Sequence, residues 1–249
     1  MIDEQTTEKL RALHLNEMAK AWDEQQRHPD TLALSFNERF GLLVDAEWTA
    51  RENKRVSRSL KEAKLRIHQA CVEGIDFPPR RELDKAIVRQ LATCQWVKQH
   101  QVVLITGPTG VGKTYVACAL AQQACRKGYR ALYRRASRLL EELRLARLDG
   151  SYARLLAKLA RIDVLVIDDF ALAPITDAER SDLLELLEDR HDLRSTILTS
   201  QLPLADWHAY LGDPTLADAI CDRVLHHAHR LVLRGPSRRK ENINPTEST

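Results

Sequence analysis

The stretch Gly107-Pro108-Thr109-Gly110-Val111-Gly112-Lys113-Thr114 matches the phosphate-loop pattern G-x-x-x-x-G-K-[ST] at every position. Residues 102–105 precede it as an apolar, β-branched run that predicts a buried strand, and residues 115–127, without Gly or Pro, predict a helix. Glycines let successive backbone N–H groups turn inward, and the positive end of the following helix attracts phosphate oxygens. The stretch therefore predicts a nucleotide site.

The residue types in this loop suit ATP and Mg²⁺. We expect Lys113 to reach the β- and γ-phosphates and to act in catalysis, and the Thr114 hydroxyl to ligate Mg²⁺. A glycine loop that fits the pattern by chance is the alternative, and the flanking strand and helix disfavour it. The residues expected to bind the nucleotide are Gly107, Pro108, Thr109, Gly110, Val111, Gly112, Lys113, Thr114 and Tyr115.

A second motif follows at residues 162–169, Ile-Asp-Val-Leu-Val-Ile-Asp-Asp. Its apolar run predicts a strand buried on both faces, as in a parallel sheet, and two acids stand where such sheets bind ligands. We expect Asp168 to order Mg²⁺ through its water shell and Asp169 to polarise the attacking water as general base. A strand that simply ends in a polar turn is the alternative, and the upstream phosphate loop argues against it.

Composition narrows the class of protein. The chain has 249 residues, 44% hydrophobic and 29% charged, with a net charge of +3 that says little about partners. Its five cysteines form no C-x-x-C pair, so we expect reduced thiols in a cytoplasmic protein. The acidic N-terminus does not resemble a secretory signal, and no apolar run is long enough for a membrane span. His226, His227 and His229 lack the acids or cysteines that would complete a metal site.

The N-terminal region predicts helices with a basic segment. Residues 6–28 read as one amphipathic helix. Ser35 and Glu38 predict a capping box at the start of the next helix, and apolar residues at helical spacing predict an apolar stripe along that helix. Residues 51–66 are rich in Lys and Arg, including Arg66. A solvated helix face is one interpretation, and a phosphate-binding surface for DNA is the other. The four residues spaced to share one helix face are Arg51, Lys54, Arg55 and Arg58.

The remaining chain alternates helices with strands, which predicts a parallel sheet with right-handed crossovers. A helix is expected over residues 83–99. Further strands are expected at 129–133, 195–199 and 230–233. The predicted domains are a helical N-terminal DNA-binding and oligomerisation domain (1–70), a linker (71–82), an ATPase domain (83–240) and a flexible tail (241–249).

Several stretches taken together resemble one family, and the resemblance extends over roughly residues 8–240. The chain is similar to the IstB-type helper ATPases of insertion-sequence transposition, which are related to the DnaC helicase loaders and more distantly to DnaA. The stretches that carry it are Asp45-Ala46-Glu47-Trp48, Arg51-Glu52-Asn53, Leu91-Ala92-Thr93-Cys94, 107–114, Leu139 to Leu145, Asp149-Gly150-Ser151-Tyr152, Asp168-Asp169, Thr199-Ser200-Gln201-Leu202-Pro203, Gly212-Asp213-Pro214-Thr215 and Asp222-Arg223.

The resemblance implies an AAA+ core, a P-loop α/β domain with a five-stranded parallel sheet flanked by helices, preceded by a small all-helical domain. It implies a homo-oligomer that assembles on double-stranded DNA with ATP, remodels it, and recruits or stimulates a partner transposase. By the same resemblance, Arg223 matches an arginine finger that completes a neighbouring subunit's site. The position that senses the γ-phosphate falls at Ser200 or Gln201.

One stretch near the end departs from the family pattern. Gly235-Pro236-Ser237-Arg238-Arg239-Lys240 lacks the acid and the Met that relatives carry, which puts a sensing role of Arg239 in doubt. Asp169 stands where many AAA+ proteins have Glu, so we expect slow turnover. A DnaC-type helicase loader is the alternative function. A small-molecule P-loop kinase is weaker, because it would leave the N-terminal third without an evident use.

Overall fold

The computed structural model describes residues 2–238, and Arg239, Lys240 and the predicted tail lie outside them. The chain divides into two compact units, up to Arg58 and from Ser59 onward, with the division inside one helix. The first unit thus ends before residue 70, where we expected the domain boundary. Among the described residues, no helix is both long and apolar enough to cross a membrane.

The first unit is helical, as predicted, but its first helix is broken. His14 adopts a left-handed conformation (φ 60°), so the single helix expected over 6–28 becomes two. The Ser35–Glu38 capping box forms, with Ser35 N–H donating to Glu38 at 2.9 Å and Glu38 N–H donating to Ser35 Oγ at 3.4 Å. The helices are α1 (Ile2–Ala12), α2 (Asn16–Arg27), α3 (Pro29–Leu32) and α4 (Phe36–Ala63).

Within this unit, Glu47 of α4 ties the start of α2 to α4. Its buried carboxylate accepts the backbone N–H groups of Glu17 and Met18 and pairs with Arg51 at 2.7 Å. The predicted apolar stripe along α4 is mostly exposed in the first unit, and only one of its members is buried. The exposed members are Phe36, Phe40, Val44 and Trp48, and the buried one is Leu43.

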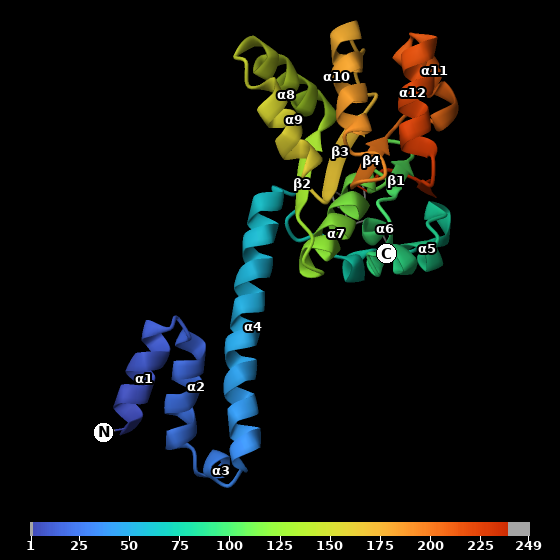
Figure 1. Ribbon diagram of the computed structural model, residues 1–249. Helices are drawn as coiled ribbons and strands as arrows, with labels where there is room; N and C mark the ends of the chain where they lie inside the picture. Colours follow the sequence, from blue (N-terminus) through green and yellow to red (C-terminus); the bar gives the residue numbers. More distant parts are fainter. Residues whose placement is uncertain (1, 239–249) are drawn as a thin grey trace. The chain divides into compact units, whose positions relative to one another are not determined.

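The second unit alternates strands and helices (Figure 1). The helix predicted over 83–99 is divided at Cys94, which has a left-handed φ of 62°. The strands are β1 (Val102–Thr106), β2 (Ala131–Arg135), β3 (Val164–Phe170), β4 (Ser195–Ser200) and β5 (His229–Val232). The helices are α5 (Lys85–Ala92), α6 (Gln95–Lys98), α7 (Lys113–Arg126), α8 (Ala136–Leu148), α9 (Tyr152–Ala160), α10 (Asp177–Glu188), α11 (Trp207–Leu211) and α12 (Pro214–Leu225).

The five strands form one sheet in the order β2-β3-β4-β1-β5, and every neighbouring pair is parallel. The predicted fold class is therefore confirmed. Parallel neighbours require crossover connections, which here are the helices between the strands. All five carboxyl ends consequently meet at one edge of the sheet, the edge that carries the phosphate loop.

Side chains alternate between two cores, one on each face of the sheet. Val103 and Ile105 face the core built with α5, α6 and α7, whereas Leu104 faces the core built with α8 to α12 (Figure 1). Ala70, just before the predicted linker, and Ile75 within it are buried in the first of these cores. The sheet is therefore covered on both faces, which leaves its edge for ligand chemistry.

Candidate nucleotide-binding site

The phosphate loop joins β1 to α7 and depends on its glycines. Gly107, Gly110 and Gly112 all have positive φ, at 145°, 84° and 99°. A Cβ on Gly107 would lie 2.1 Å from the backbone oxygen of Leu233, so no other residue fits there without moving the chain. The loop thus packs against the chain that follows β5.

Lys113 opens α7 and turns back over the loop. Its Nζ donates to the carbonyl oxygens of Gly107 at 2.7 Å and Pro108 at 2.9 Å. The ammonium group is therefore held at the mouth of the loop by neutral acceptors. From this position it can donate charge-assisted hydrogen bonds to a phosphate.

Asp168 is fully buried at the end of β3 and accepts hydrogen bonds from three hydroxyls. Thr114 Oγ1 lies 3.0 Å from each carboxylate oxygen, Tyr133 OH 2.6 Å from Oδ2, and Thr199 Oγ1 2.6 Å from Oδ1. Burial and the hydrogen bond to Asp168 raise the pKa of Tyr133, so this phenol stays protonated and donates. Four elements, α7, β2, β3 and β4, thus fix this one carboxylate.

Asp169 adopts a left-handed conformation (φ 58°) at an irregularity in β3. Its carboxylate is partly exposed, whereas that of Asp168 is fully buried. The backbone N–H of Asp169 donates to Thr199 Oγ1 at 3.0 Å. The carboxylate pairs with two guanidinium groups, Arg135 at 3.0 Å and Arg66 at 3.5 Å. The two acids therefore have different settings, one locked among hydroxyls and one facing cations.

A cavity of about 510 Å³ lies over this edge. Of the residues predicted to bind nucleotide or to catalyse, eight line it: Thr109, Gly110, Gly112, Lys113, Thr114, Tyr115, Asp169 and Gln201. Gly107, Pro108 and Val111 instead form the body of the loop, with Val111 buried in the core. Asp168 lies directly behind Thr114, so the predicted phosphate and metal groups come together in one place.

The two sensor candidates face different ways. The buried Ser200 hydroxyl donates to the Phe170 carbonyl at 3.0 Å and accepts the Leu202 N–H at 3.0 Å, so it is occupied by the backbone. Gln201 lines the cavity and accepts a hydrogen bond from Thr109 at 2.6 Å. Gln201 is therefore the candidate that can contact a phosphate.

Thr114 and Asp168 suit the predicted Mg²⁺. One offers a hydroxyl oxygen and the other a carboxylate, which are the hard oxygen ligands that Mg²⁺ takes beside substrate phosphates. Their 3.0 Å contact joins two groups that the ion would use together. Bound there, the ion would neutralise charge on the phosphates.

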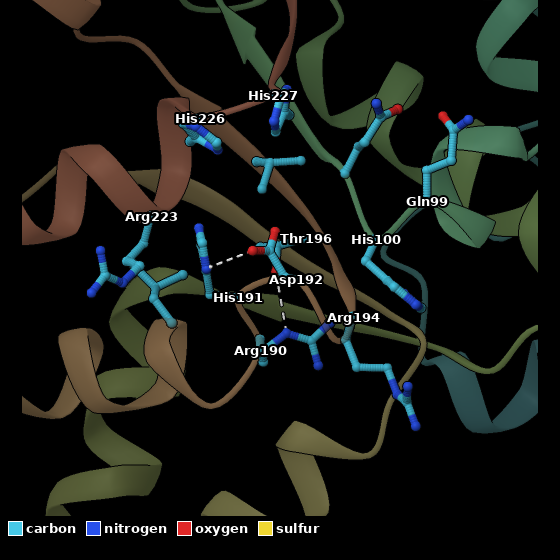
Figure 2. Close-up of a pocket in the computed structure, with 13 residues that line it drawn as sticks. Gln99, His100, Arg190, His191, Asp192, Arg194, Thr196, Arg223, His226 and His227 are labelled. Carbon is cyan, nitrogen blue, oxygen red and sulfur yellow. Dashed lines mark hydrogen bonds and ion pairs between the residues drawn. The ribbon is translucent and has the colours of Figure 1, made fainter.

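Arg223 lies away from this edge, beside a second cavity of about 170 Å³ (Figure 2). Val102 and Thr196, at the amino ends of β1 and β4, line this cavity, so it belongs to the opposite edge of the sheet. Arg223 pairs there with Asp222 at 2.6 Å and Glu188 at 3.2 Å. His226 and His227 also line this second cavity, where Arg190 is buried and donates to Thr196 at 3.2 Å.

The predicted DNA contacts are all exposed on α4, in the first unit. Arg51 is paired with Glu47 and Arg55 with Glu52, both at 2.7 Å. A paired guanidinium has less net charge to offer a phosphate, so Arg51 and Arg55 contribute less to this surface than their spacing alone suggests.

The residues of the site that sequence reasoning missed are Arg66, Tyr133, Arg135, Thr199 and Arg238. Arg66 was counted with the basic segment, yet it lines the nucleotide cavity in the second unit. The sequence does contain a signal for Thr199. When the alternation of side chains along β4 is continued by one residue, Thr199 and Gln201 lie on one side of the strand and Ser200 on the other.

Comparison with known proteins supports this description. A family model described as "IstB-like ATP binding protein" matches residues 8–245. The insertion-sequence ATP-binding protein y4pL of Sinorhizobium fredii (strain NBRC 101917 / NGR234) is 45% identical over 240 residues, covering 96% of this chain and 98% of that protein. The ATP-binding protein of insertion sequence IS1162 from Pseudomonas fluorescens is 50% identical over 203 residues, covering 82% and 88%.

Solved structures with the same fold are more distant in sequence. The DnaC helicase loader matches with a TM-score of 0.55 and 21% identity, over 66% of this chain and 97% of that one. The replication initiator DnaA bound to AMPPCP and single-stranded DNA matches with a TM-score of 0.54 and 16% identity, over 70% and 54%. These two likenesses concern the AAA+ fold alone. By the family model and its close relatives, the chain belongs to the IstB-like ATP-binding proteins of insertion sequences.

Proposed function

We propose that this protein hydrolyses ATP to control its assembly on double-stranded DNA, where it remodels the duplex and recruits or stimulates the transposase of its insertion sequence. The proposal rests on family membership and on the position of Arg223. Arg223 belongs to one edge of the sheet and the phosphate loop to the other. Since Arg223 lies at the edge away from its own nucleotide cavity, we infer that it serves the site of a neighbouring copy, which makes the active form a homo-oligomer.

In the proposed hydrolysis, Asp169 takes a proton from the attacking water. The water oxygen bonds to the γ-phosphorus, and the bond from that phosphorus to the β–γ bridging oxygen breaks. Lys113 and Gln201 hold the phosphates, and Asp168 with Thr114 would hold Mg²⁺. Arg223 of the neighbour adds positive charge where the transition state needs it, a contribution worth roughly 10³–10⁵ in rate where measured.

DNA binding is proposed for the α4 face of Arg51, Lys54, Arg55 and Arg58. Clustered cations release counterions from the phosphate backbone, so such binding weakens steeply as salt rises. The helicase-loader alternative is not favoured, because the likeness to DnaC extends to the fold alone, whereas the relatives that match most of the chain belong to insertion sequences.

The test measures duplex binding over a range of salt concentrations. Replacing Arg51, Lys54, Arg55 and Arg58 together by Gln should weaken binding and flatten the slope of log K against log salt by about 2 to 4, at about 0.9 per lost phosphate contact. A matched variant with Arg138, Arg144, Arg154 and Lys158 replaced by Gln, on exposed faces of α8 and α9, should retain the slope. The reverse result would place the DNA on α8 and α9 and refute the α4 surface.

A further inference from the structure

We propose that Arg66 is a phosphate-binding residue of the chain's own ATP site and distinguishes ATP from ADP by contacting the γ-phosphate. This inference rests on the nucleotide site of the proposed function and adds a residue from outside the sheet and its loops. Arg66 follows the last residue of α4 by three positions.

The position of Arg66 indicates the γ-phosphate end of the cavity. Its guanidinium lies 3.7 Å from Asp168 and 3.5 Å from Asp169. One of these acids is the proposed metal ligand and the other the proposed general base, so both belong by their chemistry to the reacting end of the nucleotide. A cation placed between them faces the group that ATP has and ADP lacks.

The backbone around Arg66 is firmly held. Leu65 is buried in the core beside α7, and the backbone N–H of Ala70 donates to the carbonyl oxygen of Ile67 at 3.1 Å. The side chain itself is about two-fifths exposed and lines the cavity. An anchored backbone with a guanidinium that reaches the cavity suits a ligand-contacting arginine, because the backbone there has little freedom to lose on binding.

The present partners of Arg66 leave donors for a ligand. Although burial opposes it, hydrogen bonding to Tyr133 and the charges of Asp168 and Asp169 raise its pKa, so the guanidinium stays charged. Both carboxylates lie beyond normal hydrogen-bond distance from it, and each has shorter contacts, from hydroxyls to Asp168 and from Arg135 to Asp169. Phosphate oxygens would offer Arg66 the bidentate geometry that these acids do not give it here.

The charge of the cavity supports the same conclusion. Its lining has four cationic side chains and one acidic side chain, Asp169. Such an excess of positive charge suits a polyanion. Lys113, the cation predicted from the phosphate-loop motif, is only one of these four side chains. The four are Arg66, Lys113, Arg135 and Arg238.

The experiment compares equilibrium dissociation constants for ADP and for AMPPCP, an ATP analogue that is not hydrolysed, both with Mg²⁺. Arg66→Gln should weaken AMPPCP binding at least about tenfold and ADP binding less than about threefold, and Arg66→Lys should recover part of the loss. Arg126→Gln on α7 is the matched control, because Arg126 pairs with Glu73 outside the cavity and should leave both constants unchanged.

Equal weakening of both nucleotides would overturn the proposal and make Arg66 a residue that only shapes the cavity. Unchanged or tighter AMPPCP binding would overturn it as well. Thermal unfolding of each variant checks that the fold is intact. If the wild-type chain binds AMPPCP but does not hydrolyse ATP, the proposed hydrolysis fails while the Arg66 comparison still stands.

Discussion

Thr199 Oγ1 lies 2.6 Å from Asp168 Oδ1 and donates a hydrogen bond to it. The same oxygen accepts the backbone N–H of Asp169, so one hydroxyl on β4 sets the positions of both acids on β3. Neither acid can shift without breaking a contact to the neighbouring strand. The geometry of the site is therefore a property of the sheet as much as of β3.

Replacing Thr199 by Val keeps the volume and removes this hydroxyl. We expect a loss of about 1–3 kcal/mol in the free energy of unfolding, because the buried carboxylate of Asp168 loses one of its three hydroxyl donors and the Asp169 N–H loses its acceptor. ATP turnover should fall at least about tenfold, since Asp169 loses its backbone anchor. Thr199→Ser restores the hydroxyl and should recover most of both. Denaturant unfolding and phosphate release measure the effects, and a Val variant as active as the Ser variant would contradict the role.

Mixing two inactive variants tests whether sites are shared between copies. Lys113→Ala should abolish ATP binding, whereas Lys127→Ala, at the exposed far end of α7, should not. Arg223→Ala should bind ATP and fail to hydrolyse it. When the two variants are mixed, Lys113→Ala subunits provide Arg223 to the intact nucleotide sites of the Arg223→Ala subunits. ATP hydrolysis should therefore return to a fraction of the wild-type rate. Hydrolysis by Arg223→Ala alone at the wild-type rate would refute the arginine finger.

Gly107 and Gly41 form a matched pair for stability. In Gly107→Ala the new Cβ meets the Leu233 carbonyl at 2.1 Å in a left-handed conformation, and we expect a loss of more than about 2 kcal/mol. In Gly41→Ala, inside α4, the new Cβ meets no atom within 4 Å and should stabilise the helix by about 0.5–1 kcal/mol. Thermal unfolding of both variants checks the contrast.

The helical unit should be sensitive to acid through Glu47. Although burial opposes it, hydrogen bonds from Arg51 and from the Met18 and Glu17 N–H groups lower the pKa of Glu47 below its usual 4.5. The unfolded chain therefore binds this proton more readily, so the stabilisation is complete above pH 4.5 and is lost as the pH falls through the folded value. Glu47→Gln should weaken the unit at neutral pH and reduce its response to acid, while Glu8→Gln, at an exposed position, should do neither. Circular dichroism between pH 6 and pH 3 provides the measurement.

The sequence was sufficient where one local pattern decides the structure. The phosphate loop, the acids of β3 and the alternation of strands and helices carry their own signals, and the parallel sheet followed from them. The breaks at His14 and Cys94 carried no such signal, because neither Gly nor Pro marks these two left-handed positions. Arg66 was misplaced for a related reason, since a basic run in the sequence does not show that the chain leaves the helix before its last member.

The backbone conformation at Asp169 restricts which substitutions this position can accept during evolution. Its left-handed conformation is tolerated best by Asp, Asn and Gly, and a longer acid would carry strain of about 1–2 kcal/mol there. Exchange to Glu, the acid of many AAA+ proteins, would therefore require the irregular end of β3 between Ile167 and Phe170 to be rebuilt first. Asn enters with little strain and removes only the charge. A single substitution to Asn would thus remove the proposed general base without disturbing the fold, whereas placing a longer acid there requires several changes at once.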